Sequence, residues 1–486
     1  MKKIIALLLV LAMALSLAAC GADQPAPAAT EAPAATEAPA ATEAPAETEA
    51  EGYAVAATAD VEAALADANS IVLDARLQDS YSGWALGTDA RGGHIPGADN
   101  FSAFWLTCQY DEEGNLEGLT REQVLAETME NKGITADKNV IVYDTNGTDA
   151  VAVCDYLASK GITNLSVYDA NEWLNDSAKE LESYPNYDMY VPASIVHDIV
   201  TGNVPAGFTD AENIVVLDVA WGNNEESGYV DGHVPTAVHI NTDSYEPPVA
   251  YVNDIVEWRL ADDATLLQLL LDNGITKDTC VIITGYEPMA TCRMGVICKY
   301  FGVEDVHVMS NGMVGWLSAG YELETGANEP VPATDLGIAE IPADHTWIDT
   351  MDEMKASLGT EGYTLVDNRT WEEHIGESTG YSYHDIAGRI EGSVFGYAGI
   401  NSSSSVYYYR NVDKSMRNAD EILAMWEECG IDVNDRLAFM CGSGWRVAEI
   451  LWDARIMGMD NTCIYSDGWI AWSNEGNPYV TGEPTK

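Results

Sequence analysis

The chain has 486 residues and a formal net charge of −55, because 78 aspartates and glutamates outnumber 23 lysines and arginines. A surface this acidic repels the phosphates of nucleic acids and the head groups of anionic lipids, which excludes nucleic-acid binding and electrostatic adhesion to a membrane. The length exceeds one ordinary hydrophobic core and predicts about three folded domains.

The N-terminus has the pattern of an export signal. Two lysines precede an apolar run at 4–19 that is too short to span a bilayer comfortably, and residues 17–20 read Leu-Ala-Ala-Cys. This ending resembles the lipobox of bacterial lipoproteins, and an ordinary secretory signal is the alternative. The resemblance implies a signal peptide at 1–19 and lipidation of Cys20. We therefore expect an exported chain that only its lipid anchors to the outer face of a bacterial cell membrane.

A spacer follows the lipidation site. Residues 20–52 repeat TEAPAA and are rich in Ala, Pro, Thr and Glu, with no aromatic residue before Tyr53. This composition buries too little apolar surface to offset the loss of conformational entropy on ordering. We expect a disordered, semi-extended linker that lifts the folded part away from the lipid.

The rest of the chain repeats one pattern three times. Each copy begins with a β-branched strand that ends in Asp and closes with an apolar strand followed by a turn and a Trp. The Asp–Trp pairs are Asp74 and Trp173, Asp218 and Trp316, and Asp367 and Trp469. Since the three separations differ by only a few residues, one ancestral unit accounts for all three copies.

Within each copy, strands alternate with stretches of helical periodicity, such as those at 419–428 and 445–457. This alternation predicts an α/β fold in which each parallel sheet has helices on both faces. We place the three domains at 53–187, 188–335 and 336–486.

All three copies share a segment that precedes the predicted loop, and in one copy this segment ends in a cysteine. The segments 131–144, 272–285 and 428–441 carry Gly-Ile at the same offset before an apolar run, and they end in Asp144, Gly285 and Cys441. The third copy alone keeps a thiol there, so we expect the first two domains to be structural or docking modules. The predicted substrate-binding loop then follows, with Gly442, Ser443, Gly444, Trp445 and Arg446.

The turn after Cys441 has the composition of an anion-binding site. Gly442 and Gly444 permit a tight curl that points successive N–H groups inward, and the following helix adds the positive end of its dipole. These groups stabilise a thiolate and then a persulfide. Arg446 keeps its charge and anchors either the loop or an anionic donor. The alternative for Cys441 is a packing role at the end of a buried strand.

These motifs resemble those of rhodanese domains. Asp74, Ala75 and Arg76 with GHIPGA at 93–98 resemble the family's opening signature, and GHVP at 232–235 resembles a second copy. The third copy departs at 388–392, but its loop 441–446 is similar to the family's Cys-x-x-Gly-x-Arg pattern. The last domain resembles exported three-rhodanese-domain sulfurtransferases of enteric bacteria. The resemblance implies three tandem rhodanese-like domains, of which the third is catalytic.

Loop length and neighbouring residues refine this interpretation. Four residues separate Cys441 from Arg446, whereas cysteine phosphatases that resemble this fold carry five, so the resemblance favours sulfur transfer over phosphate chemistry. We expect Arg369 to form a structural ion pair with Asp367 or a neighbour, with a supporting contact to substrate as the alternative. Glu373 stands where two-domain family members carry a donor-binding Arg, so the preference for thiosulfate stays open.

We therefore predict a sulfurtransferase that moves sulfane sulfur from thiosulfate or a related donor to a thiol or cyanide through a persulfide on Cys441. The alternative is a non-catalytic surface-binding or scaffold lipoprotein built from rhodanese domains. Neither the nine cysteines nor the eight histidines show metal-ligand spacing, so we expect no metal and no cofactor. We expect the other cysteines to be mostly free and buried, including Cys292 in a core helix.

Overall fold

The computed structural model describes residues 52–110, 116–208, 213–252 and 254–484. The signal peptide at 1–19, the lipidation of Cys20 and nearly all of the spacer at 20–52 lie outside these residues, so they stay predictions. Within the described part, the longest apolar helices fall short of what a membrane crossing needs.

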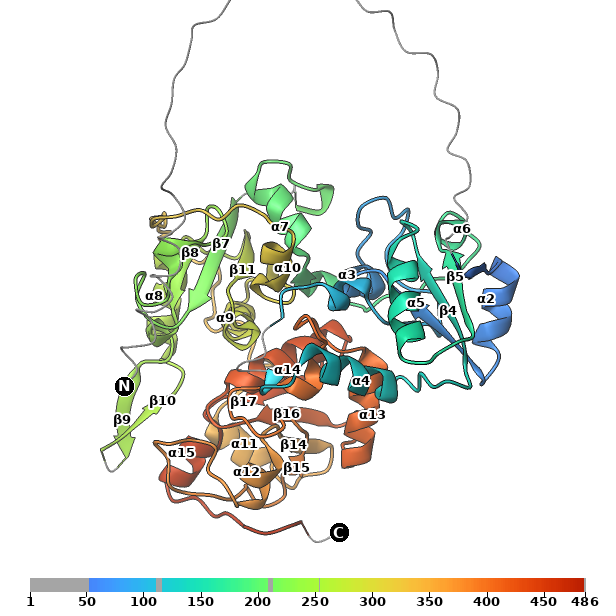
Figure 1. The fold of residues 1–486 in the computed structure, drawn as a ribbon. Helices are drawn as coiled ribbons and strands as arrows, with labels where there is room; N and C mark the ends of the chain where they lie inside the picture. The colour runs from blue at the N-terminus through green and yellow to red at the C-terminus, as the bar shows by residue number, and fades with distance from the viewer. Residues whose placement is uncertain (1–51, 111–115, 209–212, 253, 485–486) are drawn as a thin grey trace, which may run out of the picture. The chain divides into compact units, whose positions relative to one another are not determined.

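The described residues form three five-stranded sheets with the same strand order, and every pairing within them is parallel (Figure 1). The first sheet runs β1 (Ala54–Val55), β5 (Leu165–Asp169), β4 (Asn139–Asp144), β2 (Ser70–Asp74), β3 (Asp99–Asn100). The second runs β6 (Tyr190–Val191), β12 (Val306–Met309), β11 (Thr279–Thr284), β7 (Asn213–Ala220), β8 (Val238–Asn241). The third runs β13 (Ile348–Asp349), β17 (Thr462–Tyr465), β16 (Arg436–Met440), β14 (Tyr363–Asp367), β15 (Val394–Phe395).

The predicted α/β class with three repeats is confirmed. Each sheet takes its strands from one of the ranges 53–187, 188–335 and 336–486, which we call the first, second and third repeats. The boundaries themselves stay predictions.

Helices connect the strands in each repeat. The first has α2 (Thr58–Leu65), α3 (Gln78–Ser82), α4 (Arg121–Asn131), α5 (Asp149–Ser159) and α6 (Asn171–Leu174). The second has α7 (Ala193–Val200), α8 (Asp263–Asp272), α9 (Pro288–Tyr300) and α10 (Met313–Ser318). The third has α11 (Met351–Ser357), α12 (Trp371–Ile375), α13 (Ala419–Cys429), α14 (Trp445–Ile456) and α15 (Gly468–Asn474).

The side chains of β16 point alternately to the two faces of the third sheet, which explains why helices cover both faces. Leu437 and Phe439 belong to a core cluster with residues of α13 and α14, while Ala438 and Met440 belong to another with residues of α11 and α15. Successive side chains of a strand point to opposite faces, so a strand that is apolar throughout needs cover on both sides. The two helices predicted from periodicity, at 419–428 and 445–457, correspond to α13 and α14.

Helix α9 of the second repeat packs against α14 of the third. Gly295 permits the close approach, because a Cβ there would lie 2.8 Å from the ring of Trp452. Cys292 lies in α9 and is fully buried, so its predicted core position is confirmed. All eight cysteines among the described residues are free, as expected.

One element has no counterpart in the predicted pattern. Strands β9 (Pro248–Val252) and β10 (Ile255–Trp258) form an antiparallel hairpin in the second repeat. The first and third repeats have no such pair among their described strands. This hairpin brings Trp258 to the site described next.

Candidate active site

Cys441 lies between the end of β16 and the start of α14. Its side chain is almost fully buried, and its Sγ accepts a hydrogen bond from the backbone N–H of Gly444 at 3.2 Å. Gly444 has a φ of 97°, which a glycine adopts without strain. A Cβ on Gly442 would lie 1.8 Å from the hydroxyl oxygen of Tyr381, so this position excludes any side chain. The turn therefore presents the backbone N–H of Gly444 to the sulfur.

Two backbone N–H groups at the N-terminal end of α15 form hydrogen bonds with this turn. The N–H of Trp469 donates to the carbonyl of Cys441 at 2.8 Å, and the N–H of Ile470 donates to the carbonyl of Gly442 at 3.1 Å. Because both carbonyl groups point toward α15 and are hydrogen-bonded there, the backbone of the turn is held in the curved conformation that an anion-binding turn requires.

Arg446 forms a buried ion pair with Glu373 of α12. Its Nη1 and Nη2 atoms lie 2.9 and 3.0 Å from the two carboxylate oxygens, and Nη2 also donates to the hydroxyl of Tyr381 at 3.1 Å. Burial opposes ionisation of Glu373, but the charge of Arg446 outweighs it, so the pKa of Glu373 lies below its usual value. Of the two roles considered for Arg446, the geometry supports anchoring of the loop.

Arg369 lies outside the cavity that contains Cys441. Its Nε and Nη2 atoms each lie 2.7 Å from a carboxylate oxygen of Asp367, and Nη2 also donates to the carbonyl of Gly388. Burial raises the pKa of Asp367, but Arg369 outweighs this effect and holds it far below the usual value. The structure thus places Arg369 in a structural ion pair with Asp367, and its supporting contact to substrate stays a prediction.

A cavity of about 380 Å³ opens onto Cys441. The third repeat contributes Tyr381, Tyr383, Ser403, Ser404, Cys441, Ser443, Trp445 and Arg446. The second repeat contributes Trp221, Thr242, Asp243, Glu246, Trp258, Glu287 and Met289. The sequence analysis missed this second set, because no repeated motif marks these positions. Ser443 and Trp445 of the predicted loop both line the cavity.

Aromatic rings and carboxylates dominate the cavity wall. The rings of Trp258 and Tyr383 meet edge to face at 5.2 Å, and Trp221 is 64% exposed at the surface. Arg446 is the one base among the described lining residues, against three carboxylate side chains. Two of these carboxylates form ion pairs from behind the wall, Glu246 with Arg293 and Glu287 with Arg410, and the third, Asp243, adds a negative charge to the cavity.

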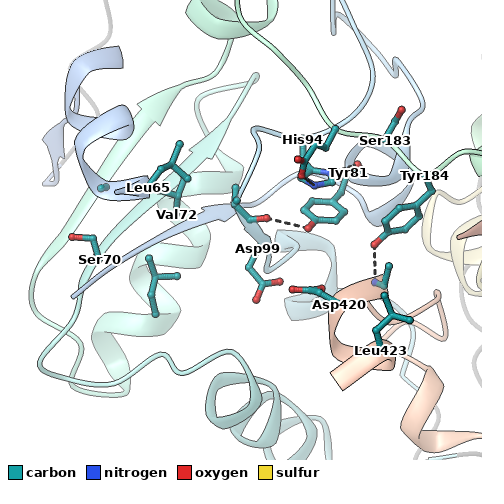
Figure 2. A pocket seen from close by; sticks show the side chains of 16 residues that line it. Leu65, Ser70, Val72, Tyr81, His94, Asp99, Ser183, Tyr184, Asp420 and Leu423 are labelled. Atoms are coloured by element: carbon teal, nitrogen blue, oxygen red, sulfur yellow. Dashed lines mark hydrogen bonds and ion pairs between the residues drawn. The ribbon is translucent and has the colours of Figure 1, made fainter. Parts of the chain in front are cut away.

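A larger cavity, of about 570 Å³, lies elsewhere, between residues of the first and third repeats (Figure 2). Tyr81 donates a hydrogen bond to the carbonyl of Ala98 there, and the hydroxyl of Tyr184 accepts one from the N–H of Ala419, each at 3.0 Å. Its lining includes no cysteine. Size alone therefore does not identify the reactive site.

One group of possible metal ligands was not apparent from spacing. The ligand atoms of Cys280, Asp305 and His307 lie within 4.8 Å of one another. The His307 ring nitrogens lie 2.6 Å from the carbonyl oxygen of Asp188 and 2.7 Å from a carboxylate oxygen of Asp305. Hydrogen bonding within the protein accounts for this arrangement, so we assign no metal to it.

Comparisons with known proteins agree with the repeat pattern. The model of the rhodanese-like domain matches residues 57–174, 206–319 and 350–475. Thiosulfate sulfurtransferase YnjE of Escherichia coli is 32% identical over 424 residues, which cover 85% of this chain and 90% of that protein. Its crystal structure superposes with a TM-score of 0.77, over 89% of this chain and 97% of that one.

A second solved relative differs in its described substrate. The anaerobic ergothioneine biosynthesis enzyme from Chlorobium limicola, solved with its natural substrate trimethyl histidine, is 29% identical. It superposes with a TM-score of 0.79 over 89% of this chain and 100% of that one. Human 3-mercaptopyruvate sulfurtransferase is 23% identical over 273 residues, which cover 54% of this chain and 86% of that protein.

Proposed function

Since the chain belongs to the rhodanese family, we propose that it is a sulfurtransferase in which Cys441 carries the transferred sulfur. The contact of 3.2 Å between the N–H of Gly444 and Cys441 Sγ, inside a cavity at the start of a helix, carries this proposal. The inward N–H of Gly444 and the positive end of α14 favour an anionic sulfur at this point. Cys441 is the one cysteine among the described residues that line the cavity.

Two displacements make up the proposed reaction. The thiolate of Cys441 attacks the outer sulfur of the donor; the new S–S bond forms as the donor's bond to that sulfur breaks, and the leaving group keeps the electron pair. When thiosulfate is the donor, the leaving group is sulfite. An acceptor thiolate or cyanide then attacks the outer sulfur of the persulfide, and Cys441 departs as a thiolate. The two steps balance without an external oxidant or reductant.

The charges around the cavity favour a donor with less charge than thiosulfate. Glu373 already matches the charge of Arg446, Arg293 and Arg410 pair with Glu246 and Glu287, and Asp243 adds a further carboxylate to the wall. A dianion approaching Cys441 meets net repulsion. We therefore propose a singly charged hydropolysulfide, or a neutral persulfide, as the preferred donor.

A cationic amino-acid derivative is the second candidate for the acceptor. The rings of Trp221, Trp258 and Tyr383, with the carboxylate of Asp243, provide the surroundings in which quaternary ammonium groups bind. The C. limicola enzyme was solved with trimethyl histidine. Transfer to such an acceptor converts a ring C–H and the persulfide S–H into a C–SH group and the Cys441 thiol, so atoms and electrons balance.

Acceptor competition tests this function. The full chain is first exposed to hydropolysulfide, and its mass gain is measured; dithiothreitol, cyanide or trimethyl histidine is then added and the products are identified by mass spectrometry. Products from the thiol or cyanide support the first acceptor class. A sulfur adduct of trimethyl histidine that weakens in Asp243→Asn supports the second. Failure to take up sulfur from every donor favours the scaffold alternative.

We also propose that the mature chain is exported and held at the outer face of a bacterial cell membrane by lipid on Cys20. The charged start, the short apolar run and the Leu-Ala-Ala-Cys ending at 17–20 support this proposal.

A further inference from the structure

We propose that Arg293 and Glu246 of the second repeat position the loop that carries Cys441, so that a repeat without its own nucleophile completes the active site of the third. This inference rests on the proposed sulfur transfer at Cys441. Its first readout nevertheless needs no sulfur donor, so the two claims fail separately.

Arg293 contacts one flank of the Cys441 loop. It lies on α9 with no exposed surface, and its Nη2 donates to the hydroxyl of Ser466 at 2.7 Å. Ser466 precedes α15, where the N–H of Trp469 holds the carbonyl of Cys441. A Cβ on Gly444 would lie 3.0 Å from Nη2 of Arg293. The guanidinium therefore stands directly against the residue whose N–H reaches the sulfur.

Glu246 links Arg293 to the other flank. One carboxylate oxygen accepts from Nε of Arg293 at 2.7 Å, and the other accepts from the indole N–H of Trp445. Trp445 is the first residue of α14 and directly follows the turn at 442–444. Glu246 is itself only 1% exposed. The pair therefore contacts the loop at two places. Arg293 reaches it through Ser466, and Glu246 reaches it through the indole of Trp445.

Stability alone does not account for these contacts. A buried ion pair is often no more stabilising than a well-packed apolar pair of similar volume, because both charges lose their hydration. What an apolar pair cannot reproduce is directed hydrogen bonding to Ser466 and Trp445. Since reactivity falls steeply when reacting groups are displaced by about 1 Å, fixed contacts on the loop have a chemical consequence.

The test compares variants that remove the pair with one that disturbs the same interface elsewhere. Arg293→Met combined with Glu246→Met removes both charges, and Arg293→Lys keeps the charge but reaches one partner at a time. Tyr190→Phe is the matched control, because its hydroxyl, on β6 of the second repeat, donates to Asp453 on α14 of the third at 3.1 Å. Melting of each variant reports folding.

Two rates are measured for each protein. The first is alkylation of Cys441 by iodoacetamide, followed by peptide mass, and the second is sulfur uptake from hydropolysulfide over a range of concentrations. We expect both rates in the double variant to fall by about tenfold or more. The loss should appear in the rate at saturating donor, with KM changed less than about twofold because removing both members of the ion pair leaves the net charge of the cavity wall unchanged.

Arg293→Lys should recover part of both rates, and Tyr190→Phe should keep parental rates. If the double variant does not fold, Arg293→Lys carries the test alone, with about a threefold loss expected. The inference is overturned if a folded double variant keeps the parental rates of alkylation and sulfur uptake. The same holds for Arg293→Lys when it is the only test, and in both cases the sulfur-transfer proposal stays intact. A parent that accepts no sulfur overturns the sulfur-transfer proposal, while the alkylation rates still decide whether the pair positions the loop.

Discussion

Asp144 in the first repeat takes the place that Cys441 takes in the third, and each accepts a hydrogen bond from the glycine N–H three residues later. The distances are 3.1 Å from Gly147 to the carboxylate and 3.2 Å from Gly444 to the sulfur. The carboxylate also accepts from the N–H of Ala150 at 2.9 Å. The anion-binding turn therefore persists in the first repeat, with a fixed side-chain anion in place of a reactive sulfur.

The Glu373–Arg446 pair gives a prediction about donor charge. Glu373→Gln leaves the guanidinium of Arg446 without its matching carboxylate, so the cavity gains positive charge. We expect the KM for thiosulfate to fall several-fold relative to that for hydropolysulfide, while stability drops by about 3 kcal/mol because a buried charge has lost its partner. Steady-state kinetics with both donors and urea unfolding measure the two effects. An unchanged KM ratio in a folded variant contradicts the charge argument.

Gly442 gives a steric prediction. A Cβ at this position would overlap the hydroxyl of Tyr381 at 1.8 Å, so Gly442→Ala forces the ring or the loop to move. We expect sulfur uptake to fall by about a hundredfold. Gly207→Ala is the control, since a Cβ there meets no atom within 4 Å. Equal uptake by the two variants would show that the loop tolerates displacement.

Asp79 gives a pH-dependent prediction. Burial raises its pKa to about 7, against a hydrogen bond from Ser310 and with a further rise from Asp413. The unfolded group titrates near 3.8, so the folded chain binds the extra proton between these values and loses stability as pH rises from about 4 to 7.

Asp79→Asn stays neutral, so we expect it to be more stable than the parent at pH 8 by up to about 4 kcal/mol, with the difference shrinking toward pH 4. Urea unfolding at several pH values measures this difference. The exposed Asp352→Asn serves as control. A pH-independent difference for Asp79→Asn would rule out titration of this carboxyl as the cause.

The lipid anchor gives a prediction about location. Cys20→Ser should move the protein from the membrane fraction to the soluble fraction and leave sulfur uptake unchanged, because residues 20–52 separate the anchor from the folded part. Fractionation followed by immunoblotting measures the release. Retention of the variant in the membrane would mean that another surface or partner holds the chain.

The sequence predicted the parts of this molecule that repeat. Strands ending at Asp74, Asp218 and Asp367 have a local pattern strong enough to place each sheet, and the glycines around Cys441 mark the turn directly. The cavity wall from the second repeat was not predictable in this way. Glu246 and Trp258 lie in or beside an unrepeated hairpin, and their approach to the third repeat depends on how α9 packs on α14.

The partner of Arg446 was also hidden in the sequence. Glu373 is 73 residues away, and its capping of α12 is a sufficient local reason for a glutamate at that position. Only the tertiary structure shows that the same carboxylate also neutralises Arg446.

The most direct test of the account is the location of the transferred sulfur. The parent, Cys441→Ser and Cys292→Ser are exposed to hydropolysulfide, and intact mass and peptide mass are recorded; Cys292 is the control because it is a fully buried thiol in α9. We predict that the parent and Cys292→Ser each gain one sulfur atom on the peptide that contains Cys441, and that Cys441→Ser gains none. Equal uptake by Cys441→Ser, or a label on Cys292 in the parent, would contradict the assignment of Cys441 as the sulfur carrier.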